Sequence, residues 1–436
     1  MIELTIDDLS HDARGIAHRD GKAVFVAGAL PGERVQVQRL HHGKAFDQGT
    51  LASAADIIEP SPERTEPRCA HFGVCSGCSL QHLDAAAQIL YKNNHLREDL
   101  KRIGRVEPLH WLAPLTADIW GYRHKARLSV KDVQKKGKVL VGFRELDGRF
   151  VADVAHCHTL APVVGTRIAE LAALVQTLDA RREIPQIEIA VADNACALVF
   201  RHLSPLSDVD QCKLQAFGEA QSLQIWLQPK GPDTVHCISQ NPATLRYQLP
   251  AYGLDIEFLP LDFTQVNPSL NQKMLAQALD LLALKPGDSV LELFCGLGNF
   301  TLPMAQTGAK IFAVEGDAGL VKRARANAER HGLANHIEYR VANLFEPQLE
   351  NAWAKAGYSK LLLDPPRAGA EQILRELPNL SAERIVYVSC NPATFARDAE
   401  ILVHQRGYQL HSAGVMDMFT HTSHVESIAL FTKAGR

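Results

Sequence analysis

Residues 289–300 read SVLELFCGLGNF, and this stretch decides the fold. The apolar run 289–293 predicts a buried strand, and Gly296 and Gly298 follow it at a turn. Glycines at such a turn let the backbone approach a ligand closely, and the helix expected next presents free N–H groups. The following apolar run ends in Glu315, 19 residues after Gly296, where nucleotide-binding α/β folds place an acid against ribose hydroxyls.

The same turn distinguishes three kinds of ligand. A dinucleotide-binding turn would have a third glycine where this chain has Thr301, and a P-loop would need a Gly-Lys-Ser/Thr ending that the turn lacks. S-adenosylmethionine has no phosphate and needs only the close backbone approach and the acid for its ribose. The turn therefore predicts a site for S-adenosylmethionine.

Helical and strand patterns alternate from about residue 268 onward. Compact apolar strands separate segments of helical spacing, which cover 268–284, 317–332, 371–376 and 393–405. This alternation predicts a Rossmann-like α/β domain with a mainly parallel sheet wrapped by helices. Because parallel strands end at one edge of a sheet, the residues that follow each strand should face one crevice.

Three polar residues follow apolar strands of this domain. Asp364 is held by the rigid Pro365-Pro366 turn, and Cys390 lies near the start of a helix, which favours a thiolate. A methyl donor and a thiolate in one crevice predict methylation of a carbon that is not itself nucleophilic, such as C5 of a pyrimidine. Asn343 follows a third strand and is either an adenine contact or an ordinary loop residue.

The reaction also needs a base that removes the proton from C5. Glu426, just ahead of the apolar run 427–431, is the candidate, and its residue type fits a solvated strand start equally well. Methylation of cytosine C5 or of an exocyclic amine is the competing chemistry for this crevice, and Cys390 would be dispensable for the amine reaction.

Three motifs occur in a fixed order: FCGLGNF (294–300), DPPR (364–367) and SCNP (389–392). With DFTQVN (262–267) and HTSHVES (421–427), they resemble the RNA uracil-C5 methyltransferase family across the catalytic half of the chain. The resemblance implies that Cys390 is the nucleophile and Glu426 the proton acceptor. Together with the Gly-rich turn, it implies that the S-adenosylmethionine and uracil site is lined by Gln265, Phe294, Gly296, Asn299, Glu315, Asn343 and Asp364.

Nine cysteines form an odd number, which disfavours a disulfide framework. Cys69, Cys75 and Cys78 lie within ten residues, and Cys157 can supply a fourth thiolate. Four thiolates suit either tetrahedral zinc or a [4Fe–4S] cluster, and the spacing does not separate the two. The resemblance favours iron, because family members that act on ribosomal RNA carry a [4Fe–4S] cluster with similar cysteine spacing.

Short strand patterns separated by turns fill the N-terminal segment and predict a small β-barrel. The resemblance implies that this barrel is a TRAM domain of the oligonucleotide-binding type. Alternating strand patterns, among them FVADVA at 150–155, and one helical stretch near 162–178 predict a β-rich central domain, and Asp84 can cap a helix over 84–103. The barrel is expected at 1–59. The central domain with the metal site is expected at 60–83 and 116–262, and the methyltransferase domain at 84–115 and 263–436.

The composition excludes several classes of protein. The net charge is −3, so RNA binding must depend on a local patch, for which His124, Lys125 and Arg127 are candidates. The chain has no run of about 18 apolar residues and no basic start with an apolar segment. We therefore expect a soluble cytoplasmic protein with no membrane contact.

The barrel and the cysteine cluster together resemble the branch of the family that acts on large-subunit ribosomal RNA. We expect S-adenosylmethionine-dependent methylation of C5 of a uridine in 23S rRNA, with the target uracil flipped out of its stack, by a monomer. The alternatives are methylation of a uracil in tRNA or in another rRNA, and a non-enzymatic iron–sulfur RNA-binding protein.

Overall fold

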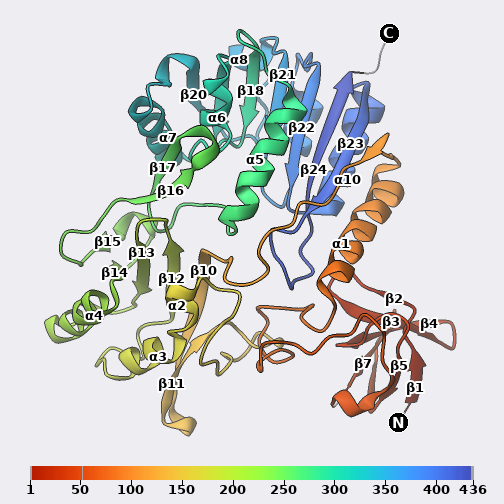
Figure 1. Cartoon of the computed structure of the whole chain (residues 1–436), viewed down its shortest axis with the longest axis vertical. Helices are drawn as coiled ribbons and strands as arrows, with labels where there is room; N and C mark the ends of the chain where they lie inside the picture. The colour runs from red at the N-terminus through yellow and green to blue at the C-terminus, as the bar shows by residue number, and fades with distance from the viewer. Residues whose placement is uncertain (1, 52, 434–436) are drawn as a thin grey trace.

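An eight-stranded sheet organises the C-terminal half of the computed structural model, which describes residues 2–51 and 53–433 (Figure 1). The strand order is β20-β19-β18-β21-β22-β24-β23-β9. The first five strands run parallel to one another, whereas β24 is antiparallel to both of its neighbours. The strands are β9 (His110–Trp111), β18 (Ser289–Leu293), β19 (Lys310–Glu315), β20 (Ile337–Val341), β21 (Lys360–Leu363), β22 (Arg384–Ser389), β23 (Tyr408–Met416) and β24 (Glu426–Lys433).

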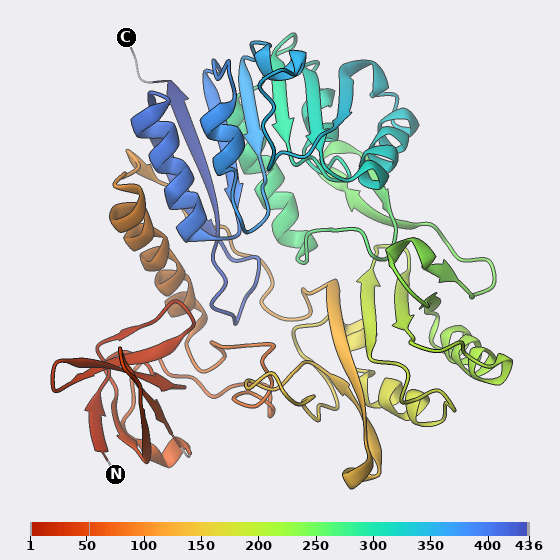
Figure 2. The ribbon, with the colours of Figure 1, turned by 180° about the vertical axis from the view of Figure 1, so that it is seen from behind.

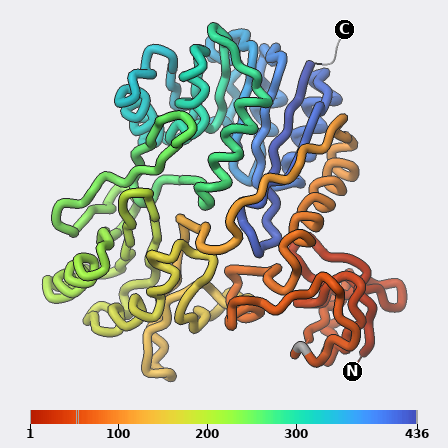
Figure 3. The backbone as a smooth tube through the Cα atoms, in the orientation of Figure 1, coloured from red at the N-terminus to blue at the C-terminus, as the bar shows by residue number. Residues whose placement is uncertain are grey.

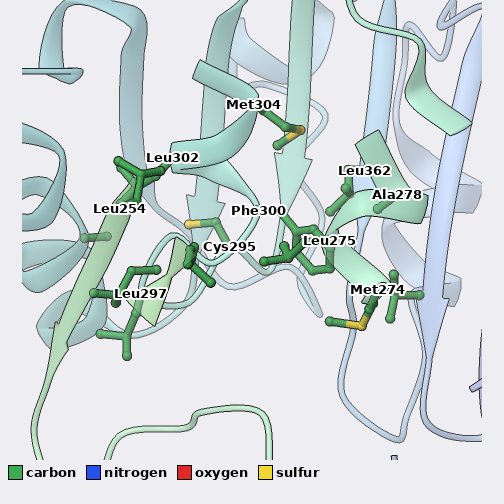
Figure 4. Close-up of a cluster of buried hydrophobic side chains, with 14 of the residues drawn as sticks. Leu254, Met274, Leu275, Ala278, Cys295, Leu297, Phe300, Leu302, Met304 and Leu362 are labelled. Atoms are coloured by element: carbon green, nitrogen blue, oxygen red, sulfur yellow. The ribbon is translucent and has the colours of Figure 1, made fainter. Parts of the chain in front are cut away.

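Helices cover both faces of this sheet, which confirms the predicted α/β domain (Figures 1 and 2). They are α1 (Ala85–Asp99), α5 (Pro268–Leu282), α6 (Thr301–Gln306), α7 (Ala318–Arg330), α8 (Ala352–Lys355), α9 (Glu371–Glu376) and α10 (Pro392–Glu400). On one face, Met274, Leu275 and Ala278 of α5 pack beside Leu362 of β21 and Phe300 of the Gly-rich turn (Figure 4). On the other face α1 and α10 pack together and bury Leu96, Leu100, Phe395 and Ala396.

The central domain contains a six-stranded sheet of order β11-β10-β12-β13-β14-β15 and a separate hairpin of β16 and β17. Its strands are β10 (Lys125–Val133), β11 (Lys138–Gly142), β12 (Gln186–Val191), β13 (Cys196–Arg201), β14 (Gln224–Gln228), β15 (His236–Cys237), β16 (Leu245–Leu249) and β17 (Leu254–Phe258). Helices α2 (Pro162–Gly165), α3 (Ile168–Gln176) and α4 (Asp208–Gln221) accompany the sheet, and the predicted helical stretch near 162–178 is therefore confirmed as two helices.

One strand prediction in this domain is wrong. The segment 150–155 forms no strand, and only Val151 makes a single bridge, to Arg144. The Val154 N–H donates to the Ala152 carbonyl two residues back, so the backbone turns away from the neighbouring strand on its way to Cys157. Local apolar alternation predicted a ladder that this turn interrupts.

The N-terminal barrel consists of two sheets, of order β1-β5-β8 and β2-β3-β4-β7-β6. Its strands are β1 (Ile2–Thr5), β2 (Asp8–Leu9), β3 (Arg14–Arg19), β4 (Lys22–Ala27), β5 (Arg34–Val37), β6 (Arg39–His42), β7 (Asp47–Thr50) and β8 (Ile57–Glu59). Alternate residues of β4 and β5 point inward, and Val24, Val26, Val35 and Val37 are fully buried. The predicted small barrel is confirmed.

Helix α1 connects the barrel with the edge of the large sheet, and the chain then returns to the central domain (Figure 3). Asp84 caps the helix as predicted, since its carboxylate accepts from the N–H groups of Ala86 and Ala87. Lys92 of α1 is fully buried, and its Nζ lies 2.6 Å from Oδ1 of Asp417 after β23. Burial lowers the pKa of Lys92, and the Asp417 carboxylate opposes that change.

Removing the cation of this buried pair should be strongly destabilising. We expect Lys92→Met to lower the free energy of unfolding by about 3–5 kcal/mol, because the Asp417 carboxylate is left buried without its partner. Urea denaturation measures the loss, and the double variant Lys92→Met/Asp417→Asn should regain much of it. Equal losses in the single and double variants would contradict the ion-pair account.

Candidate active site and cysteine centre

Three of the predicted site residues meet at the carboxyl edge of the large sheet. Cys390 directly follows β22, and Asp364 directly follows the neighbouring parallel strand β21. Strand β24 runs the opposite way beside β22, with Ser389 opposite Ser427, so Glu426 begins its strand next to Cys390. The sheet topology therefore brings a thiol and two carboxyl groups together from distant parts of the sequence.

The Cys390 thiol is protonated in this arrangement. Burial raises its pKa to about 12, the Glu426 and Asp364 carboxyls add to the rise, and the Arg367 guanidinium opposes it. The expectation that the helix start favours a thiolate is wrong here. Helix α10 begins at Pro392, and the side chain of Asn391, not the sulfur, accepts from the first free N–H group at Ala393.

The pKa values of both carboxyl groups are raised into the neutral range. Burial raises the pKa of Glu426 to about 8, with a further rise from Asp364, while Arg367 and Lys92 lower it. Burial alone raises the pKa of Asp364 to about 7. The side chain of Gln265 donates to Oδ2 of Asp364 at 3.5 Å, so a further predicted site residue lies beside the carboxyl cluster.

The Gly-rich turn has the backbone that its sequence predicts. Gly296 and Gly298 have positive φ angles of 55° and 95°, and Phe294 also lies in the left-handed region at 64°. A side chain at Gly296 would meet no atom within 4 Å, so this face of the turn is open to a ligand. Glu315 accepts from the N–H of Gly296 at 3.1 Å, which ties the predicted ribose acid to the turn.

Two other predicted cofactor residues have their side chains engaged elsewhere. The carboxamide of Asn299 exchanges two hydrogen bonds with Asn271 of α5 and accepts a third from Tyr247, so it fastens the turn to the helix. Asn343 donates to Glu346 and accepts from the Phe345 N–H within its own loop. These are hydrogen bonds of a loop residue, and contact with adenine stays a prediction.

The four predicted metal-ligating cysteines line one small cavity, although Cys157 is 79 positions beyond Cys78. Burial raises the pKa of Cys75 to about 11 and that of Cys78 to about 12, and in both cases Cys157 and Cys69 add to the rise. The thiols are therefore near enough to repel one another as thiolates. A cationic metal centre is the kind of group that would offset this repulsion.

Four thiolates suit either a tetrahedral zinc ion or a [4Fe–4S] cluster. In the part of the chain that the structure describes, no group of three or more His, Cys, Asp or Glu side chains has the arrangement of a metal site. The identity of the group that the four cysteines would hold therefore stays a prediction.

Comparison with protein families identifies the chain. The family model described as tRNA (Uracil-5-)-methyltransferase matches residues 195–434, which is more than half of the protein. The chain belongs to this family. The resemblance that the motifs suggested is thereby confirmed, and a TRAM domain matched at residues 1–38 confirms the prediction for the N-terminal barrel.

Curated members of the tRNA (Uracil-5-)-methyltransferase family match over almost the full length. The chain is 52% identical to the 23S rRNA (uracil(1939)-C(5))-methyltransferase RlmD of Xanthomonas campestris pv. campestris, over 99% of this chain and 97% of the relative. It is also 52% identical to the RlmD of Xylella fastidiosa, over 98% of this chain and 96% of the relative.

A solved structure shares the fold of this family member. It is the tRNA (uracil-54, C5)-methyltransferase of Pyrococcus abyssi in complex with S-adenosyl-L-homocysteine, at 22% identity and a TM-score of 0.74. The match covers 99% of this chain and the whole of that chain, so the multidomain arrangement is common to both. Among the described residues of this chain, no helix is long and apolar enough to cross a membrane.

Sequence reasoning missed two charged residues of the site. Arg367 contacts a ring nitrogen of His424 at 2.5 Å and lowers the pKa of both Cys390 and Glu426. The sequence did contain a sign that Arg367 belongs to the site, because this residue ends the DPPR motif and directly follows the turn that holds Asp364. Glu292 lies inside β18, where burial raises its pKa to about 8, and its place within an apolar strand gave no sign of a role.

The predicted basic strip is only partly available to RNA. Lys125 is partly buried and donates to the Pro260 carbonyl, and burial lowers its pKa to about 8, so its ammonium group is engaged within the protein. Burial also lowers the pKa of His124. Arg127 is exposed, but its guanidinium lies 2.9 Å from Glu188 on the next strand. Cross-strand neighbours, which the sequence does not reveal, decide how these cations are used.

Proposed function

We propose that this protein transfers a methyl group from S-adenosylmethionine to C5 of a uridine in 23S rRNA. The observation that carries the proposal is the meeting of Cys390, Glu426 and Asp364 at the edge of the sheet that also presents the Gly-rich turn. Full-length relatives named as 23S rRNA uracil-C5 methyltransferases support ribosomal RNA over tRNA. The thiol and the buried acid argue against a protein that only binds RNA.

The residues divide the reaction into two stages. The Cys390 thiol releases its proton to water, and Sγ bonds to C6, which moves the C5=C6 electrons onto C5 and O4 as an enolate. S-adenosylmethionine, when bound, would supply an electrophilic methyl to C5, with S-adenosylhomocysteine as the leaving group. The Glu426 carboxylate then removes the remaining proton from C5, the C5=C6 bond reforms, and Sγ leaves as thiolate.

The target uracil must leave its stack for Sγ to reach C6, so we include base flipping in the proposal. Gln265 and Asp364, which contact each other beside Cys390, are placed to line the pocket for the base and the methyl donor. Glu315 and Gly296 are proposed to hold the methyl donor through its ribose and through the open backbone of the turn. The enzyme is proposed to act as a cytoplasmic monomer.

We also propose a [4Fe–4S] cluster held by Cys69, Cys75, Cys78 and Cys157. The shared cavity supports one centre that all four thiols hold in common, and the family resemblance favours iron over zinc. The Gly77 N–H donates to Cys75 Sγ at 3.4 Å, and the Thr159 hydroxyl lies 3.2 Å from Cys157 Sγ. Hydrogen bonds to the sulfurs stabilise thiolates in such centres. With four thiolates committed, the role of the cluster is structural.

The domain limits are likewise a proposal, with the barrel at 1–59, the central domain at 60–83 and 116–262, and the methyltransferase domain at 84–115 and 263–436. The packing of α1 against α10 and the burial of Lys92 against Asp417 support assigning 84–115 to the last of these.

Covalent trapping tests the reaction. With RNA that contains 5-fluorouridine at the target, wild-type protein and S-adenosylmethionine should give a stable protein–RNA adduct on denaturing gels, because fluorine cannot leave as a proton. Cys390→Ala should form no adduct and lose turnover. Glu426→Gln should accumulate an adduct even with ordinary RNA, because the proton on C5 is no longer removed. Turnover by Cys390→Ala would contradict the mechanism.

The pH dependence follows from the raised pKa of Glu426. The base must be ionised, so below a pKa of about 8 the kcat should rise about tenfold for each pH unit. Because the Arg367 charge lowers the pKa of Glu426 and Cys390, Arg367→Gln should shift this limb to higher pH. Single-turnover methylation between pH 6 and 9 measures both curves, with Arg127→Gln as the control. A flat wild-type profile is the opposing result.

Metal analysis tests the cysteine centre. Protein purified without oxygen should be brown and contain about four iron and four sulfide per chain, because each thiolate binds one corner of the cluster. Cys78→Ala should lose most of this iron, whereas Cys212→Ala, an exposed cysteine outside the cavity, should retain it. A colourless protein with one zinc per chain would exclude the cluster.

A further inference from the structure

Glu426 is delivered to the active site by residues 417–425, the connection between β23 and β24, which we call the base loop. The loop extends beyond the end of the large sheet toward residues 69–83, which we call the cysteine segment (Figures 1 and 2). The two segments are more than 330 positions apart in the sequence. Their contacts determine where the first residue of β24 lies.

The cysteine segment binds the base loop immediately after Cys78. The N–H groups of Ser79 and Leu80 donate to the same carbonyl, that of His421, at 2.8 and 2.9 Å. The Ser79 hydroxyl accepts from the N–H of Ser423 at 2.9 Å. Three hydrogen bonds therefore join the residues that follow a metal-ligating cysteine to positions three and five residues ahead of Glu426.

Gln88 of α1 binds both segments at once and is only 1% exposed. Its Oε1 accepts from the His421 N–H at 3.0 Å, and its Nε2 donates to the carbonyls of Leu80 and Leu83 at 3.0 and 2.8 Å. A buried amide with this many partners fixes the relative position of the groups it joins, because each lost bond leaves a buried polar atom unpaired.

His421 itself is held in an unfavourable backbone conformation. Its φ angle is 64°, in the left-handed region that non-glycine residues rarely occupy. Its ring stacks on Trp120 at 4.0 Å between centroids, and the edge of Trp120 faces His158, the neighbour of Cys157. Such a conformation persists only where the surroundings hold it, and here the cysteine segment, Gln88 and Trp120 contact His421.

We propose that the cysteine segment positions the catalytic base: the filled metal centre fixes Ser79 and Leu80, which hold the base loop and thereby align Glu426 with C5 of the target. Ser79 and Gln88 are then positioning residues for proton removal. This inference rests on the proposed uracil methylation, in which Glu426 acts only after the sulfur–carbon bond has formed. Loosening the base loop should therefore slow elimination and leave adduct formation intact.

The first experiment compares two serines of the cysteine segment. Ser79→Ala removes the bond to Ser423, whereas the matched control Ser76→Ala removes a hydroxyl that donates to the Arg144 carbonyl in the central domain. With ordinary RNA and S-adenosylmethionine, Ser79→Ala should lower kcat about three- to tenfold, the worth of one hydrogen bond, and increase the steady-state protein–RNA adduct. Ser79→Thr, which keeps the hydroxyl, should restore both values, and Ser76→Ala should match wild type.

The second experiment needs neither RNA nor turnover. Hydrogen exchange is compared between iron-loaded protein and protein from which the iron has been removed by a chelator. Peptides covering the base loop should exchange faster after iron removal, whereas peptides of α7 on the far side of the sheet should be unchanged. Equal exchange of the base loop in both forms would overturn the proposal, even if Ser79→Ala misfolds.

The outcomes separate this inference from the proposed function. If wild type forms no adduct with 5-fluorouridine RNA, the proposed methylation itself fails. If wild type forms that adduct but Ser79→Ala behaves like wild type, or loses kcat without accumulating adduct, only the positioning role fails. Adduct accumulation by Ser79→Ala together with faster exchange of the iron-depleted base loop supports it.

Discussion

The antiparallel pairing of β24 with β22 is the constraint on which the active site depends. Parallel strands all end at one edge of a sheet, so Asp364 and Cys390 would meet there in any α/β protein of this order. An antiparallel strand starts at this edge, so its first residue lies beside the last residues of the neighbouring parallel strands. Glu426, 36 positions after Cys390, reaches the thiol in this way.

Burial of three acidic groups in one place has an electrostatic consequence. Asp364 raises the pKa of Glu426 and of Cys390, Glu426 raises that of Cys390, and the pKa values of about 7, 8 and 12 for Asp364, Glu426 and Cys390 all lie above their ordinary range. Arg367 and Lys92 oppose this effect from two different elements, the turn after β21 and helix α1. Raised pKa values at these groups suit the proposed mechanism, in which Cys390 loses a proton and Glu426 gains one.

The methyltransferase domain does not form this site alone. Helix α1, which enters from the side of the barrel, buries Lys92 against Asp417 and Gln88 against the base loop. The cysteine segment adds hydrogen bonds to the same loop from Ser79 and Leu80. Two segments from the first hundred residues thus contact the loop that leads to Glu426.

Much of the fold and the site could be predicted from sequence because their signals are local. The Gly-rich turn, the cap at Asp84, the residues after each strand and the cysteine spacing depend on backbone conformation and near neighbours. Charge state and partner choice depend on burial and on contacts between distant segments. The local helix start predicted a thiolate at Cys390, but burial beside two carboxyls keeps the proton on sulfur. The strand position of Lys125 predicted a surface cation, but a carbonyl across the domain engages it. Sequence determined which groups the protein carries to the sheet edge, and only the tertiary structure decided their protonation and their partners, because desolvation and Coulomb interactions act through space and not along the chain.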